Sequence, residues 1–100
     1  MKIYPAQTIP KGSLSYVVRP PHEAMGGDWI YLAIRHRDQF YDGPIPPGWT
    51  MIEDSIIQAM VHHGLTLFYK VYDGVPVAEK FYLNSRSRSD MYLNIFIQKG

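Results

Sequence analysis

Residues 50–63, TMIEDSIIQAMVHH, decide the fold class that this sequence predicts. Thr50 is suited to cap the N-terminus of a helix, because Glu53 follows three residues later and completes a capping box. Gly64 then supplies a residue that readily adopts the left-handed conformation at a helix end. The pattern therefore predicts one α-helix over about residues 51–63. Its buried stripe, at helical spacing, would consist of Ile52, Ile56, Ala59, Met60 and His63.

Three other segments have the length and the residue types of β-strands. Residues 29–35, WIYLAIR, are apolar at nearly every position, which favours a strand near the middle of a sheet. Residues 91–98, MYLNIFIQ, alternate between two sets, and Tyr92 and Phe96 belong to the set that faces away from the core. Residues 14–19 predict a further strand, which a pair of prolines ends.

Residues 66–72 and 77–83 predict a β-hairpin whose turn can be set in two ways. A four-residue turn places Lys70 opposite Glu79 and pairs two phenylalanines, whereas a two-residue Asp-Gly turn brings neither pair together. We favour the longer turn because opposite charges and paired rings each stabilise a sheet. This turn also keeps Pro76, which has no N–H group, out of the ladder of hydrogen bonds. The last strand would then follow as the third strand of a meander.

Together these elements predict a single α+β domain spanning residues 1–100, because a chain of this length builds one core. The expected order is β-β-α-β-β-β. A mostly antiparallel sheet of about five strands would cover one of its faces with the helix of residues 51–63. The other face would be half-exposed to water.

Composition excludes several classes of function. The chain has 10 Lys and Arg against 9 Asp and Glu, a balance less basic than that of dedicated nucleic-acid binders. It has no cysteine, which excludes disulfides and thiolate metal sites, and no apolar run of membrane-spanning length. Adjacent His62 and His63 on a helix would point in different directions and would not chelate one metal. We expect a cytoplasmic protein without cofactor, metal or membrane partner.

The aromatic content suggests how the protein works. It includes 8 Tyr, 4 Phe and 2 Trp, whereas nucleophile-elbow, phosphate-loop and dinucleotide-binding motifs are absent, so we assign no catalytic residue. Tyr and Trp are common anchors of protein interfaces. We therefore interpret the chain as a non-catalytic protein that acts through protein–protein contacts, such as a small phage-type inhibitor or accessory protein. The interface candidates are Phe40 and Tyr41 in a proline-rich loop and Tyr92 and Phe96 on the last strand.

A second copy of the chain is one expected partner. If the last strand, residues 91–98, lies at a sheet edge, its unpaired backbone can pair with the same strand of another copy. The sequence then predicts a homodimer joined through an edge strand.

Two alternatives remain open. The loop of residues 84–90 contains Ser-Arg-Ser-Arg-Ser, and the arginine guanidinium group forms bidentate hydrogen bonds with phosphate. The chain would then be a nucleic-acid or phosphate-binding module that uses Arg35, Arg37, Arg86 and Arg88. The other alternative is a small hydrolase or isomerase with His22 or His36 as its acid–base group.

Overall fold

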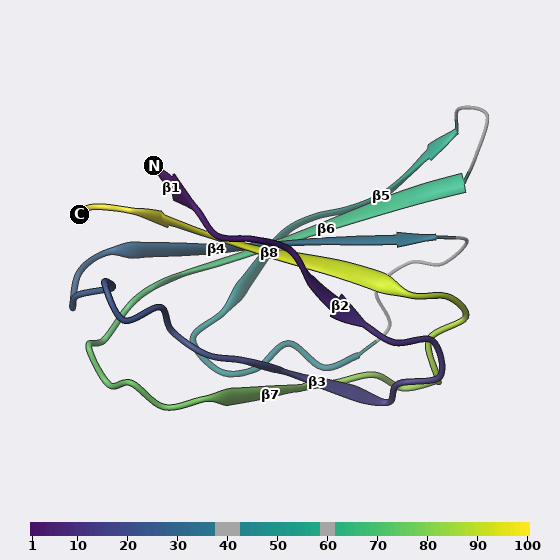
Figure 1. Cartoon of the computed structure of the whole chain (residues 1–100), viewed down its shortest axis with the longest axis horizontal. Helices are drawn as coiled ribbons and strands as arrows, with labels where there is room; N and C mark the ends of the chain where they lie inside the picture. The colour runs from purple at the N-terminus through teal and green to yellow at the C-terminus, as the bar shows by residue number, and fades with distance from the viewer. Residues whose placement is uncertain (38–42, 59–61) are drawn as a thin grey trace.

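The structure is a computed structural model in which every regular element is a β-strand. It describes residues 1–37, 43–58 and 62–100, and for residues 37, 53–58, 62 and 63 it describes the backbone alone. No helix occurs in this part of the chain, so the predicted α+β class is wrong and the fold is all-β (Figure 1). The strands are β1 (Lys2–Ile3), β2 (Gln7–Ile9), β3 (Ser15–Val18), β4 (Trp29–Arg37), β5 (Thr50–Gln58), β6 (His62–Val71), β7 (Glu79–Tyr82) and β8 (Met91–Gln98).

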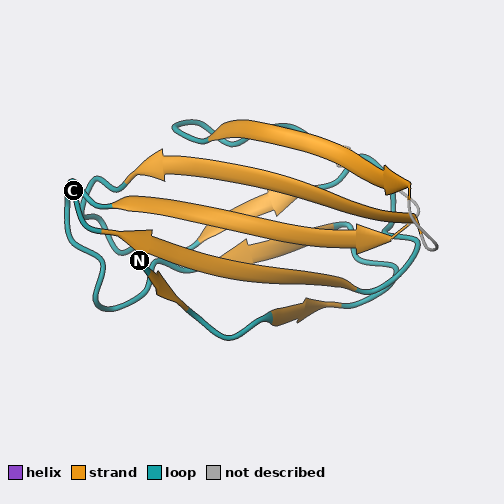
Figure 2. Ribbon diagram, turned by 90° about the horizontal axis from the view of Figure 1, so that it is seen from above, coloured by secondary structure: helices purple, strands orange, loops and turns teal. Residues whose placement is uncertain are grey.

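The strands form two antiparallel sheets that lie face to face. The larger sheet has six strands in the order β1-β8-β4-β6-β5, and β2 pairs with β8 on the same side as β1. The smaller sheet consists of β3 and β7 and lies behind the larger one in Figure 2. Strand β4 is central, as residues 29–35 predicted. Strand β8 has neighbours on both sides, so it is not the edge strand on which the predicted homodimer depended.

Residues 50–58, which we expected to form the first part of the helix, form the edge strand β5 instead. Met51 is in register with Phe68 and Gln58 with His62, with a bulge between Met51 and Glu53. The stretch contains Ile52, Ile56 and Ile57, and β-branched residues favour strands over helices. Pairing with β6 gives hydrogen-bond partners to the backbone N–H and C=O groups along one edge of β5. This gain outweighs a weak helical preference. Residues 59–61 of the predicted helix lie outside the described residues.

The predicted hairpin and meander are also wrong, although two of their side-chain pairs exist. Strand β6 pairs with β4 and β5, and β7 pairs with β3 in the other sheet. Lys70 of β6 nevertheless forms an ion pair with Glu79 of β7. Phe68 and Phe81 also meet, with their ring centroids 5.6 Å apart. The two segments thus face each other across the core instead of lying side by side in one sheet.

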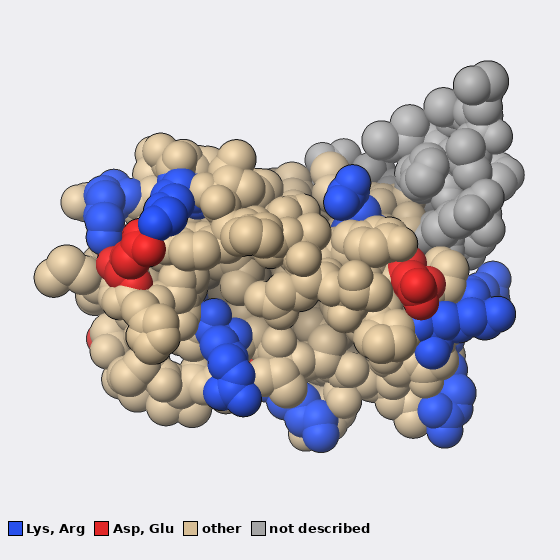
Figure 3. All heavy atoms as spheres, viewed as in Figure 1, with Lys and Arg blue, Asp and Glu red and all other residues tan. Residues whose placement is uncertain are grey.

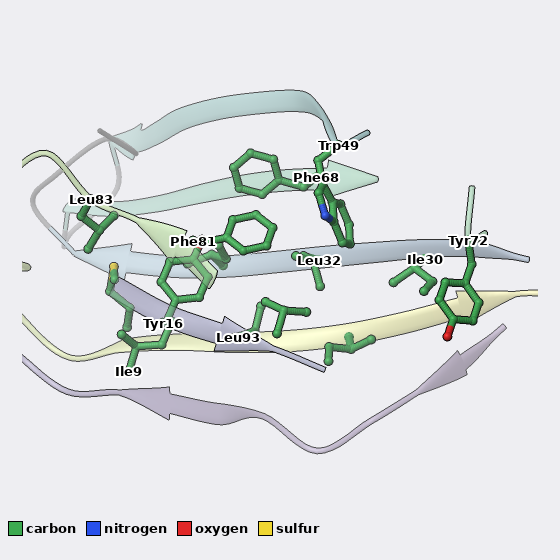
Figure 4. Packing of buried hydrophobic residues seen from close by; sticks show 14 residues of the cluster. Ile9, Tyr16, Ile30, Leu32, Trp49, Phe68, Tyr72, Phe81, Leu83 and Leu93 are labelled. Carbon is green, nitrogen blue, oxygen red and sulfur yellow. The ribbon is translucent and has the colours of Figure 1, made fainter. Parts of the chain in front are cut away.

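The core fills the space between the two sheets, and aromatic rings make its centre (Figure 4). Phe81 of the smaller sheet stacks on Tyr16 at 5.2 Å and meets the edges of Phe68 and Trp49 at 5.6 and 5.5 Å. Burying a side chain of this size contributes about 1.5–3 kcal/mol to stability. The alternation predicted for residues 91–98 is confirmed. The inward members of that strand, all buried, are Met91, Leu93, Ile95 and Ile97.

Candidate functional site

The face of the six-stranded sheet that points away from the smaller sheet is the candidate site, and we call it the outer face. Side chains alternate between the two faces of a strand, and residues paired in register share a face. In the described part of the chain no other element covers the outer face (Figure 2). Its principal residues are Ile3, Trp29, Tyr31, Ala33, Arg35, Leu65, Leu67, Tyr69, Val71, Tyr92, Asn94 and Phe96.

An apolar row crosses the outer face at right angles to the strands. Ile3 is in register with Phe96, which is in register with Tyr31. Tyr31 is in turn in register with Tyr69, so the row runs over β1, β8, β4 and β6. Trp29 lies beside this row, with its ring centroid 5.6 Å from Tyr69 and 6.4 Å from Tyr31. The rings therefore form one contiguous patch at this end of the sheet.

The opposite end of the outer face is cationic. Arg35 is exposed, and its Cζ atom lies 5.5 Å from the centroid of the Tyr92 ring. A cation over an aromatic ring is held in place by the negative potential of the ring face. Arg35 is the one charged residue of the outer face among those whose side chains are described. The described side chains of the outer face thus combine a broad apolar surface with the positive charge of Arg35.

Two of the four predicted interface residues, Tyr92 and Phe96, lie on the outer face, as their place in the alternation of the last strand required. The other two, Phe40 and Tyr41, lie outside the described residues. Sequence reasoning missed the rings of Trp29, Tyr31 and Tyr69, which we had not assigned to an interface. The spacing of Trp29 and Tyr31 by two residues was the signal that could have placed them on one face.

The predicted phosphate-binding arginines come from strand β4 and from the loop between β7 and β8. Arg35 lies on the outer face, whereas Arg86 donates a hydrogen bond through Nη1 to the carbonyl oxygen of Gly12 at 3.0 Å. That contact ties Arg86 to the loop leading into β3. Arg88 is exposed in the same loop as Arg86, and the side chain of Arg37 lies outside the description.

The two histidines predicted as alternative acid–base groups lie in different parts of the fold. His36 is buried in the core, where its Nε2 atom and the Thr66 hydroxyl are 2.9 Å apart. His22 is exposed in the loop between β3 and β4. Within the described residues no group of three or more His, Cys, Asp and Glu side chains is arranged to hold a metal ion.

Comparison with known proteins returns no relative. The chain matches no protein-family model, no curated protein and no solved structure. In addition, the described residues contain no helix long and apolar enough to cross a membrane.

Proposed function

We propose that this chain is a non-catalytic interaction protein that binds another protein through its outer face. The observation that carries the proposal is an uncovered sheet face rich in exposed rings and aliphatic side chains. Trp29 is 37% exposed, Tyr92 41% and Val71 51%. Contiguous apolar patches of this kind on a folded domain mark interaction sites. Trp, Tyr and Arg, all present here, are also the residue types that dominate binding energy at interfaces.

The chemistry of the outer face defines the partner. Its centre requires an apolar surface, and Arg35 requires a carboxylate opposite it. We therefore infer a partner whose surface has an apolar patch bordered by an acidic residue.

Pairing of two copies through an edge strand is a separate proposal, and the longest edge strand of the six-stranded sheet is β5. The bulge between Met51 and Glu53 lies on this edge. Bulges twist an edge and hinder its pairing with another sheet. The outer face therefore supports a protein partner better than the edge supports a homodimer.

The size of the chain fits a role as a small inhibitor or accessory protein that acts by covering a surface of its partner. Such a protein needs one rigid face and no catalytic group. The absence of cysteine is consistent with a reducing compartment, and we propose the cytoplasm as its location.

The proposal is tested with two double variants used as bait in lysate of the native host. Trp29→Ser/Tyr92→Ser removes two rings from the outer face, and Val17→Ser/Tyr82→Ser is the matched control on the exposed side of the smaller sheet. Val17 is 43% exposed and Tyr82 53%, so both pairs are accessible. We expect one protein to be retained by the wild type and by the control, with and without nuclease, and to be lost by the outer-face variant.

The retained protein is then purified and titrated against each bait. We expect the dissociation constant to rise by more than about tenfold for Trp29→Ser/Tyr92→Ser and to be unchanged for the control. Equal binding by both variants, or binding that nuclease abolishes, would overturn the proposal.

A further inference from the structure

A cleft of about 640 Å³ opens where the ends of both sheets meet three connecting segments. Its walls come from the β1–β2 connection, the loop of residues 19–24 and the β6–β7 connection. Tyr72 and Ile95 line it, and both are buried, being 4% and 3% exposed. Clefts of about 300–1,000 Å³ with an apolar base and a few polar groups are the usual shape of small-molecule sites.

Two basic side chains that line this cleft form no hydrogen bond or ion pair with the described residues. They are those of Arg19 and His22. Glu23 also lines the cleft, and its carboxylate is paired with Lys2, whose Nζ lies 2.6 Å from both of its oxygens. The uncompensated charge in the wall is therefore the positive charge of Arg19. Figure 3 shows basic and acidic side chains gathered at the end of the molecule near the two termini.

Tyr4 places its hydroxyl beside the Glu23 carboxylate. Its ring packs against the core, and its hydroxyl is buried. Burial, and after it the neighbouring Glu23 carboxylate, raises the pKa of the Tyr4 phenol, so the group stays protonated at neutral pH.

The walls of the cleft are held in place before any ligand arrives. The loop of residues 19–24 closes on itself through a hydrogen bond from Ala24 N to Pro21 O at 3.0 Å. Lys99 Nζ donates to the carbonyl oxygen of Glu23 at 3.0 Å, and Gly27 N donates to Tyr72 O at 2.8 Å. Binding in a preorganised cleft loses little conformational entropy.

We propose that this cleft binds a small organic anion, namely a carboxylate or phosphate group on an apolar body. Arg19 and His22 hold the anionic group at the mouth. The apolar body lies over Tyr72 and Ile95. This site is separate from the outer face, and its ligand is independent of the protein partner proposed above.

The test is an amide NMR titration of the full chain with benzoate, phenyl phosphate and neutral benzyl alcohol. We expect the two anions to shift amides of residues 4–7, 19–24 and 72–78 in a saturable manner, and benzyl alcohol to leave them unchanged. Saturation by benzoate alone assigns the site to carboxylates, and saturation by phenyl phosphate alone assigns it to phosphates. Equal binding of benzyl alcohol, or no saturation by either anion, overturns the proposal.

Two variants test whether the anion binds in this cleft. Arg19→Gln should weaken the binding of both anions by about tenfold. Ala78→Phe, which fills the cleft, should abolish binding. The matched control is Lys80→Gln, because Lys80 lies over the Tyr82 ring on the other side of β7 and is no part of the cleft. Circular dichroism confirms that each variant is folded, and wild-type affinity in Arg19→Gln would refute the proposed role of Arg19.

Discussion

Lys70 and Glu79 form an ion pair that joins the two sheets of this protein. Lys70 belongs to the six-stranded sheet and Glu79 to the smaller one, and their side chains are 12% and 25% exposed. Glu79 also accepts a hydrogen bond from Trp49 Nε1 at 2.9 Å, and Lys70 Nζ lies 5.1 Å from the centre of that ring. The three side chains therefore hold the start of β5, the C-terminal end of β6 and the start of β7 against one another.

Removing the carboxylate of this group should destabilise the fold. In Glu79→Ala the Lys70 ammonium stays largely desolvated without its counter-ion, and Trp49 loses its acceptor. We expect the free energy of unfolding in urea to fall by about 2–4 kcal/mol. The double variant Lys70→Met/Glu79→Leu should lose less than Glu79→Ala, because it leaves no buried charge. If the double variant is the less stable of the two, the ion pair is a net source of stability.

Phe81 and Tyr82 are neighbours on β7 that face opposite ways, and they make a matched pair for testing the core. Phe81 is 0% exposed, whereas Tyr82 is 53% exposed. Phe81→Ala removes the ring on which Tyr16, Phe68 and Trp49 pack, and should cost about 3–5 kcal/mol. Tyr82→Ala should change stability by less than about 1 kcal/mol. Thermal and urea unfolding of both variants check this, and similar losses would contradict the assignment of the two faces.

The Lys70–Glu79 pair also shows which parts of the fold the sequence reveals. Charge and ring complementarity correctly indicated that residues 66–72 and 77–83 meet. These preferences do not distinguish two strands side by side in one sheet from two strands facing each other in two sheets, because either arrangement brings the pairs together. The choice depends on which backbone edges are available, and β6 has both of its edges occupied by β4 and β5.

The prediction of a helix over residues 51–63 was wrong for a related reason. A capping box and a helical stripe are signals within one segment and are worth about 1 kcal/mol, whereas pairing with β6 depends on the residues up to Val71, which follow the helical pattern. The alternation of residues 91–98 succeeded because one of its faces is buried, which imposes a period of two on the sequence itself. Tyr92 and Phe96 were found through that alternation. Trp29 and Tyr31 were missed because a central strand is apolar on both faces and shows no alternation.

Acid should weaken the fold through Asp28. The hydrogen bond from Lys99, then those from the backbone N–H groups of Met25 and Gly100, keep the pKa of the Asp28 carboxyl below its ordinary value against the opposing effect of burial. A carboxyl whose pKa is lowered by folding stabilises the protein above its unfolded pKa of about 3.9, and this contribution is lost as the pH falls through the folded pKa.

The variant Asp28→Asn isolates this effect. At neutral pH we expect a lower melting temperature than that of the wild type, and the difference should shrink as the pH falls below about 4. Glu23→Gln is the control, because the Lys2–Glu23 pair is exposed to solvent and its removal should have little effect on stability. A difference between wild type and Asp28→Asn that stays constant down to low pH would show that the carboxylate charge does not contribute.

Nucleic acid should bind weakly or not at all. The chain has a formal net charge of only +1, and Arg86 donates a hydrogen bond to the carbonyl oxygen of Gly12. We expect no retardation of single- or double-stranded oligonucleotides at physiological salt concentration, and no difference between the wild type and Arg86→Ala/Arg88→Ala. Salt-dependent binding by the wild type that the double variant loses would restore the nucleic-acid hypothesis.

Trp29 should report directly on the outer face. The protein has two tryptophans, of which Trp29 is 37% exposed on the outer face and Trp49 is 7% exposed in the core. When a partner covers the outer face, Trp29 leaves water and its fluorescence emission should shift to shorter wavelength, while Trp49 does not change environment. The variant Trp29→Phe should therefore lose the shift, and Trp49→Phe should keep it. A shift that persists in Trp29→Phe would place the partner elsewhere on the molecule.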